Sequence, residues 1–127
     1  MIITTTEFVK ILKNICTQET SFDPKGWSSS NPLWGHCAVA SLLAQDYFGG
    51  QIIKSSLKGN EKYSYLNSHY WNRLDDGTEI DFTEEQYPDL SFKDLQPEIK
   101  EREALLENLD TTRRYKLIKQ AFDNFVN

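Results

Sequence analysis

The sequence predicts an α+β fold that forms a single domain over residues 1–127. The first observation is that residues 35–48 are apolar on nearly every helical face, which is typical of a buried helix. The second is that strand-like segments follow together over residues 51–83, and that helical patterns return only after them. Because helices and strands occur in separate runs, the order favours an α+β fold over a doubly wound parallel sheet. The length of 127 residues and the hydrophobic content of 39% suit one globular domain.

The first element is an amphipathic helix predicted over residues 6–17, with Thr5 or Thr6 as its cap. Its apolar side chains recur at helical spacing and form one stripe, which comprises Phe8, Ile11, Leu12 and Ile15. Cys16 lies on the edge of this stripe. The first twelve residues carry no cationic segment followed by an apolar core, so we expect no signal peptide.

The second element is the buried helix predicted over residues 35–48. Asn31 and Pro32 mark the turn that leads into it. Gly49 and Gly50 follow directly and can supply a left-handed C-cap. One face carries the large apolar side chains, which are Val39, Leu42, Leu43 and Tyr47, and alanines occupy much of the rest.

After the double glycine the hydrophobic period changes from that of a helix to that of strands. Residues 51–57 predict a first strand, and residues 68–74 and 78–83 predict the two strands of a hairpin. Residues 98–107 and 112–126 predict two further helices. Their apolar stripes are Ile99, Leu105 and Leu106 in the first of these helices, and Tyr115, Ile118, Phe122 and Phe125 in the second.

The register of the hairpin follows from a three-residue loop at positions 75–77 (Asp-Asp-Gly), with its glycine in the left-handed position that such loops favour. Leu74 then pairs with Thr78. This register places His69 and Asp81 on the same face, one diagonal step apart. A two-residue loop would shift the pairing by one and move His69 to the opposite, mostly apolar face.

The charge balance bears on the partners of the protein. Asp and Glu number 19 against 14 Lys and Arg, which gives a net charge of −5. An acidic chain lacks the electrostatic footprint of a duplex nucleic-acid binder, and no apolar run is long enough to span a bilayer, so we expect no nucleic-acid and no membrane partner. The acidic residues 98–107 and the basic residues 113–119 are expected to form solvated helix faces. Cys16 and Cys37 make no disulfide framework, which indicates a cytoplasmic protein with two free thiols.

Cys37 is the candidate nucleophile because it lies in the first turn of the predicted buried helix. The unpaired amides and the dipole at a helix N-terminus stabilise a thiolate and can also hold an oxyanion. Gly35, two residues earlier, leaves the sulfur open to approach. The alternative is a packed core thiol, which is the commoner role of an unpaired cysteine.

His69 and Asp81 complete a candidate catalytic triad with Cys37. Cys37 would act as the nucleophile, His69 would accept its proton and later protonate the leaving group, and the Asp81 carboxylate would hold the imidazole in the required tautomer. The alternatives are a satisfied strand histidine and a carboxylate that caps the following segment. Trp71 shares the face of His69 and can shield the thiol from water or contact an acyl group.

Five segments between residues 27 and 88 combine aromatic, glycine and polar residues in a distinctive order. They are Trp34-Gly35-His36-Cys37-Ala38-Val39-Ala40, Gln45-Asp46-Tyr47-Phe48-Gly49-Gly50, Ser68-His69-Tyr70-Trp71-Asn72, Asp76-Gly77 and Asp81-Phe82-Thr83-Glu84-Glu85-Gln86-Tyr87. Together they resemble the small bacterial YunG-like family. The order Cys, His, Asp, with the Cys opening a helix ahead of an antiparallel sheet, is in turn similar to the papain-like and transglutaminase-like cysteine enzymes. This similarity implies a papain-like or transglutaminase-like core with additional N- and C-terminal helices.

The resemblance also implies a reaction, namely thiol attack on an amide or related acyl bond by a cysteine hydrolase or acyl-transferase. The implied substrate is a peptide, a protein side chain or a small amide, and no cofactor is required. Papain-like enzymes place a Gln before the Cys to help form the oxyanion hole; here Asn31 lies six residues before Cys37 and can donate the same hydrogen bond. His36 stands where the family pattern has Gln, and with Trp34 and Gly35 it completes the predicted substrate-binding or oxyanion set.

Other classes of function stay open. One is a non-catalytic binding or regulatory module of the same fold, and another is a partner-binding protein such as an inhibitor. A metal site is not expected, because the adjacent His36 and Cys37 do not match zinc-ligand spacings and the sequence has no CxxC or HExxH motif. Most of the aromatic residues near positions 27–34 and 63–71 are expected to pack in the core or at its rim.

Overall fold

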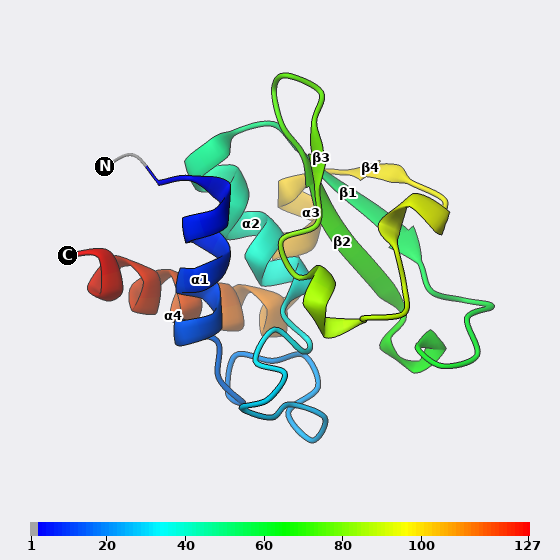
Figure 1. The fold of residues 1–127 in the computed structure, drawn as a ribbon, viewed down its shortest axis with the longest axis horizontal. Helices are drawn as coiled ribbons and strands as arrows, with labels where there is room; N and C mark the ends of the chain where they lie inside the picture. Colours follow the sequence, from blue (N-terminus) through cyan, green and yellow to red (C-terminus); the bar gives the residue numbers. More distant parts are fainter. Residues whose placement is uncertain (1–2) are drawn as a thin grey trace.

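The computed structural model describes residues 3–127, and its central element is a four-stranded antiparallel sheet (Figure 1). The strands are β1 (Gln51–Ser56), β2 (Ser68–Arg73), β3 (Glu79–Ile80) and β4 (Glu98–Lys100). Their order in the sheet is β3-β2-β1-β4, so the two long strands lie in the middle and the short ones form the edges. Short edge strands offer little backbone for pairing with other chains.

Three of the helices lie together beside the sheet (Figure 1). Those three are α1 (Thr5–Ile15), α2 (Cys37–Phe48) and α4 (Leu109–Val126), and the short helix α3 (Arg102–Leu106) leads into α4. Three 3-10 turns lie in the connections, η1 (Ser64–Leu66), η2 (Glu84–Gln86) and η3 (Phe92–Asp94). The α+β prediction is therefore confirmed. Within residues 3–127, no helix combines the length and the apolar character needed to cross a bilayer.

Helix α2 is the buried helix that the sequence predicts. Every side chain over residues 37–44 is buried. Leu43 packs in the cluster formed with α1 and α4, whereas Leu42 packs against the sheet. The side-chain amide of Asn72 in β2 donates to the backbone carbonyl of Ser41 over 3.0 Å. Because α2 is held from both sides, the core fixes the position of its first residue.

The structure corrects the predicted cap of the first helix. Thr4, rather than Thr5 or Thr6, caps α1, because its hydroxyl accepts the backbone N–H of Glu7 over 3.1 Å. The Glu7 carboxylate in turn accepts the N–H of Thr4 over 3.1 Å, which completes a capping box. Cys16 follows the helix and is buried in the main core.

The prediction of a single helix over residues 98–107 is wrong in its first part. Residues Glu98–Lys100 form β4, in which Ile99 pairs with Ile53 of β1, and the helix begins only at Arg102. Ile99 is 52% exposed, so it does not contribute to an apolar helical stripe. The pairing partner lies far away in the sequence, and such tertiary pairing overrides a weak local helical preference.

Helix α4 begins three residues before its predicted start at position 112. The early start has a local cause, since the side-chain oxygen of Asn108 accepts the N–H of Thr111 over 2.9 Å and so caps the helix. The predicted stripe is buried at Ile118 and Phe122, but Phe125 is exposed.

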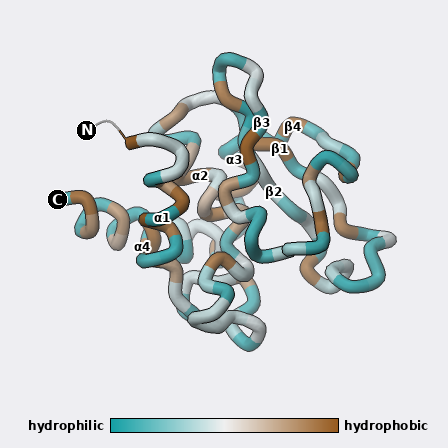
Figure 2. Tube along the Cα trace, viewed as in Figure 1, coloured by the Kyte–Doolittle hydropathy of each residue, from teal (hydrophilic) through white to brown (hydrophobic). Residues whose placement is uncertain are grey.

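The predicted hairpin register is confirmed. Arg73 pairs with Glu79, and the N–H of Leu74 donates to the carbonyl of Thr78 over 2.8 Å. Gly77 has a φ of +89°, as the three-residue loop requires. The tip of the loop, at positions 75 and 76, is hydrophilic (Figure 2). Strand β3 is shorter than predicted, so the chain leaves the sheet just before Asp81.

The connection between α2 and β1 is a tight glycine pair. Gly50 has a φ of +76°, and a Cβ atom built there would lie 2.1 Å from the carbonyl oxygen of Arg73. The backbone of the hairpin therefore lies too close for any side chain at this position.

We expect Gly50→Ala to lower the free energy of unfolding by at least about 2 kcal/mol, because the left-handed backbone and the clash both oppose the added methyl group. Gly77→Ala is the matched control, since its φ is also positive but no atom lies within 4 Å of an added Cβ. That control should lose only about 1 kcal/mol. Urea unfolding of both variants measures the difference, and equal losses would contradict the clash.

Candidate functional site

Cys37 is the first residue of α2. The helix cannot start earlier, because Gly35 has a φ of +76° and His36 adopts a non-helical cap conformation. The first intrahelical hydrogen bond runs from Ala40 N to the carbonyl of His36 over 2.8 Å, and no side chain caps the helix. The amides of Cys37 and Ala38 thus precede the helical ladder and are available as donors to a ligand.

A cavity of about 280 Å³ lies at this helix start. Gly35, Cys37 and Ala38 line one part of it, and Tyr70 and Tyr87 line another. The remaining lining residues are Phe22, Leu66, Asn67, Ser68, Lys100, Ala104, Leu105, Asn108, Thr111 and Arg114. Cys37 thus lies at a cavity wall, whereas Cys16 lies within the main core cluster.

His69 and Asp81 lie together, as the hairpin register predicts. His69 Nε2 is 2.6 Å from Asp81 Oδ2, and both side chains are almost fully buried. The second oxygen, Oδ1, accepts the backbone N–H of Thr83 over 3.1 Å and its hydroxyl over 3.3 Å. The carboxylate is therefore satisfied on both sides, and its orientation toward the imidazole is fixed.

The other ring nitrogen of His69 is the one available to Cys37. Nδ1 is buried and has no well-aligned hydrogen-bond partner among residues 3–127. Burial alone would lower the pKa of His69, but hydrogen bonding to Asp81 and Cys37 and electrostatic interaction with both groups raise it to about 10. The neighbouring thiol and carboxylate therefore favour the imidazolium form of His69.

A chain of hydrogen bonds connects Asp81 to the start of α2. The Gln86 side-chain amide donates to the hydroxyl of Thr83 over 2.7 Å. Its oxygen accepts the backbone N–H of Gly35 over 2.9 Å. Residues 81–86 therefore hold the imidazole at one end and the approach to Cys37 at the other. Thr83 and Gln86 have the spacing of a capping box, but the Thr83 side chain caps no backbone N–H and bonds to the Gln86 side chain instead.

Two of the predicted aromatic residues, Trp71 and Trp34, contact other residues of the site. Trp71 is 1% exposed, and its ring stacks on His69 with a centroid distance of 5.9 Å. Trp34 meets Tyr87 edge to face at 5.5 Å, and its indole N–H donates to Asp23 over 3.0 Å. Neither tryptophan lines the cavity. Trp71 therefore holds the His69 ring and Trp34 holds the Tyr87 ring. The sequence pattern instead predicted that Trp71 contacts an acyl group and that Trp34 binds substrate.

Of the other predicted binding residues, the structure brings Gly35 to the cavity but not Asn31. A Cβ atom at Gly35 would lie 2.2 Å from the Ser21 hydroxyl, so no other residue fits there. Asn31 lines a separate cavity with Lys13 and Pro88. Its amide donates to the carbonyl of Gln86 over 3.2 Å.

The comparisons with known proteins match this chain over nearly its whole length. A family model described as YunG protein matches residues 4–127. The chain belongs to the YunG family. "Uncharacterized protein YunG" of Bacillus subtilis (strain 168) is 31% identical over 123 residues, which cover 95% of this chain and 94% of that relative. No solved structure matches the chain.

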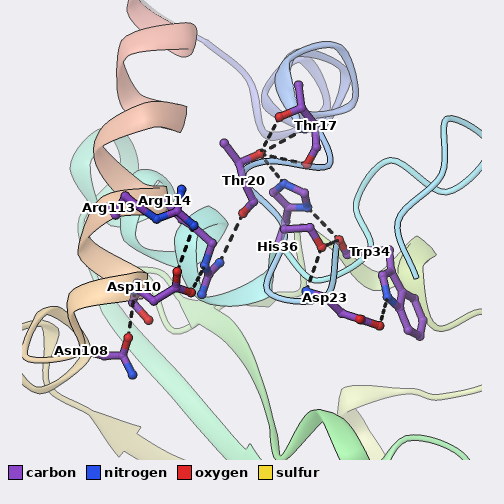
Figure 3. Close-up of polar contacts among 11 residues, drawn as sticks. Thr17, Thr20, Asp23, Trp34, His36, Asn108, Asp110, Arg113 and Arg114 are labelled. Carbon is purple, nitrogen blue, oxygen red and sulfur yellow. Dashed lines mark hydrogen bonds and ion pairs between the residues drawn. The ribbon is translucent and has the colours of Figure 1, made fainter. Parts of the chain in front are cut away.

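His36 of this YunG-family chain does not line the Cys37 cavity. Its ring instead makes polar contacts with Thr20 and Trp34 (Figure 3). It is fully buried, with Nδ1 2.9 Å from the carbonyl of Trp34 and Nε2 2.7 Å from the hydroxyl of Thr20. Burial lowers the pKa of His36 to about 4; the bond to Trp34 opposes this, and the charge of Arg114 adds to it. The ring is therefore neutral, with Nδ1 donating and Nε2 accepting.

Arg114 is the residue of this site that the sequence pattern did not reveal. Its side chain is 2% exposed, in contrast to the solvated face expected for residues 113–119. Its Nε donates to Asp110 over 2.9 Å, and its Nη1 donates to the carbonyl of Thr20 over 3.3 Å (Figure 3). One signal exists in the sequence, since Arg114 precedes Ile118 by one helical turn and so extends the buried stripe.

A larger depression of about 710 Å³ lies over residues 84–94 and contains neither Cys37 nor a histidine. Its walls carry four carboxylates, on Glu84, Glu85, Asp89 and Asp94. Within residues 3–127, no group of three or more His, Cys, Asp and Glu side chains is placed to hold a metal ion. Of the candidate triad residues, Cys37 lines the cavity of about 280 Å³, and none lines the larger depression.

The neutral state of buried His36 makes folding depend on pH. The unfolded chain binds a proton at His36 near pH 6.5, whereas the folded chain resists protonation down to about pH 4. The unfolded state thus binds more protons in this window, and stability falls as the pH falls. We expect the stability advantage of wild type over His36→Gln to shrink by about 2 kcal/mol between pH 7 and pH 5.

Urea unfolding at the two pH values measures this change. The only other histidine, His69, has a raised pKa and acts in the opposite direction, because its contribution to stability decreases as the pH rises. It is present in both proteins, so its contribution cancels in the difference between wild type and His36→Gln. An advantage that stays constant from pH 7 to pH 5 would show that His36 is not held neutral.

Proposed function

We propose that this protein is a cysteine hydrolase or acyl-transferase that acts on an amide or related acyl bond. Cys37 is the nucleophile, His69 is the general acid and base, and Asp81 orients the imidazole. The observation that carries the proposal is that Asp81 occupies Nε2 of His69, while Nδ1 has no other partner within residues 3–127 and Cys37 lies close enough to influence the ring.

Three features support the role of Cys37. The thiol lies at the first residue of a helix, where the dipole favours a negative charge. Its neighbour His69 has a raised pKa, so an imidazolium can pair with a thiolate. The side chain lies at a cavity wall, where a substrate can reach it. A thiol that served only for packing would need none of these features.

The reaction has two balanced steps. In the first, the Cys37 proton moves to His69 and the sulfur bonds to the carbonyl carbon of the substrate. The bond between that carbon and the nitrogen or oxygen of the leaving group then breaks, and His69 gives the proton to the leaving group. In the second, His69 takes a proton from water, whose oxygen attacks the thioester carbon. The carbon–sulfur bond then breaks and the proton returns to the sulfur. An amine or alcohol in place of water gives acyl transfer.

The backbone amides of Cys37 and Ala38 are the proposed oxyanion donors, in place of Asn31. Both amides precede the first intrahelical hydrogen bond, and Ala38 lines the cavity beside the thiol. Donors fixed by a rigid helix cost no reorganisation when charge develops on the carbonyl oxygen. Asn31 is directed toward Gln86 and would have to leave that contact to take part.

We relate the core to the papain-like and transglutaminase-like enzymes within the same proposal. The shared features are a cysteine at the start of a buried helix and a histidine and an aspartate on a following antiparallel hairpin. This relation is one of architecture and of residue roles.

One observation favours a second function, a non-catalytic binding or regulatory module. His69 is 1% exposed and does not line the cavity, so a ligand in this conformation reaches the sulfur but not the imidazole. In such a module, Cys37, His69 and Asp81 would form a buried polar cluster that holds the cavity in shape. The reactivity of the thiol separates the two functions.

At pH 6.5, we expect iodoacetamide to alkylate Cys37 of the native protein at least about tenfold faster in wild type than in His69→Ala, because the imidazolium stabilises the thiolate. Asp81→Asn keeps the shape of the site and should give an intermediate rate. Peptide mass spectrometry at timed points measures each cysteine separately.

Cys16 is the internal control for this experiment. It is 4% exposed, and burial raises the pKa of its thiol, so it should stay unmodified until the chain unfolds. If Cys37 reacts at the same slow rate in wild type and in His69→Ala, the thiol is not activated and the enzyme proposal fails.

A further inference from the structure

The charge of the Cys37 cavity is opposite to the charge of the protein. The chain has a net charge of −5, and the larger depression over residues 84–94 carries four carboxylates. The Cys37 cavity, by contrast, is lined by two cations, Arg114 and Lys100, and by no carboxylate. An acidic protein that places cations around one small cavity focuses a positive potential there.

Hydrogen bonds and an aromatic contact hold the Arg114 side chain at the wall of this cavity. Asp110 and the Thr20 carbonyl occupy its Nε and Nη1 atoms, and its guanidinium lies 5.7 Å from the centre of the Phe22 ring. Its Nη2 has no hydrogen-bond acceptor within residues 3–127. A buried guanidinium at a cavity wall with an unpaired Nη2 is suited to bind an anion.

Asp110 leaves part of the Arg114 charge uncompensated. The carboxylate is 54% exposed and also bonds to Arg113 over 2.9 Å, so one exposed anion serves two guanidinium groups. Lys100, on β4, has no carboxylate within 4.0 Å in the part of the chain that the structure describes. The two cations of the cavity wall are therefore only partly compensated by carboxylates of the protein.

The neutral groups of the cavity suit the same kind of ligand. Burial, followed by the charge of Cys37, raises the pKa of Tyr70 to about 12. Burial likewise raises the pKa of Tyr87, so both phenols stay protonated and can donate hydrogen bonds. The volume of about 280 Å³ limits the ligand to a small molecule or to the end of a longer one.

We propose that the Cys37 cavity selects acyl substrates that carry a carboxylate, and that Arg114 and Lys100 bind this carboxylate while the carbonyl group lies at the sulfur. The inference rests on the proposed function and adds its substrate class. Arg114 is the specificity-determining residue, because it is buried at the cavity wall and cannot move away from it. Lys100 adds charge from the strand at the cavity edge.

Two alkylating reagents of similar shape test this inference. Iodoacetate carries a carboxylate, and iodoacetamide is its neutral counterpart. The ratio of their rates at Cys37 is measured in the native protein and in the same chain unfolded in urea, where no cavity exists. We expect the iodoacetate-to-iodoacetamide ratio to be about tenfold higher in the native protein. An equal ratio in the two states would overturn the inference without the need for any variant.

Variants then assign the effect to residues. Arg114→Gln should return the ratio to the unfolded value, and Lys100→Gln should lower it in part. Arg113→Gln is the matched control, because it removes the same charge and bonds to the same Asp110 but does not line the cavity. A ratio that falls equally in Arg113→Gln and Arg114→Gln would reflect net charge alone and would overturn the role of Arg114.

The outcome also separates this inference from the proposed function. Iodoacetamide can alkylate Cys37 rapidly and in a His69-dependent way without any preference for iodoacetate. That result leaves the enzyme proposal intact and rejects the inference that the cavity selects carboxylate-bearing substrates. A Cys37 that is inert toward both reagents rejects the enzyme proposal and the carboxylate together.

Discussion

Asp81 accepts a hydrogen bond at each of its two oxygens, and these bonds fix the chain at the point where it leaves the sheet. One oxygen binds the imidazole of His69, and the other binds Thr83 in the turn that follows. Gln86 in the same turn then holds Gly35, two residues before the thiol. This short segment thus adds a polar link between the sheet and the start of the buried helix to the direct packing of α2 on the sheet. Because these groups are buried, each lost partner would leave an unsatisfied polar atom, which is costly. The geometry between thiol and imidazole therefore depends on this segment as well as on strand β2, which carries His69.

Short-range patterns predicted the parts of the fold that local chemistry controls. The Asp-Asp-Gly loop determined the hairpin register, and with it the pairing of His69 with Asp81. The apolar character of residues 35–48 likewise predicted the burial of α2. Residues 98–100 show the opposite case, since their strand conformation depends on β1, which lies far away in the sequence. No local signal distinguishes such an edge strand from the first turn of a helix.

The candidate site likewise contains residues that local patterns predict and residues that only tertiary packing brings into place. Cys37, His69 and Asp81 could be predicted because a helix start and a hairpin register are local properties. Arg114 could not be assigned to the site, since only the docking of α4 against α2 brings it to the cavity. For His36 the sequence was misleading, because its position beside Cys37 suggested a binding role, yet both of its ring nitrogens make hydrogen bonds within the fold.

The glycine pair at the end of α2 has a mechanical consequence. The helix has 12 residues and, at 1.5 Å per residue, acts as a rigid rod about 18 Å long. Gly50 joins this rod to β1 at one end, and Cys37 lies at the other. A tilt of about 5° at the glycine end would displace the sulfur by about 1.5 Å, which is comparable to the misplacement that impairs chemistry between two positioned groups. The close contact of Gly50 with Arg73, at the far end of the helix, therefore helps to fix the position of the Cys37 sulfur.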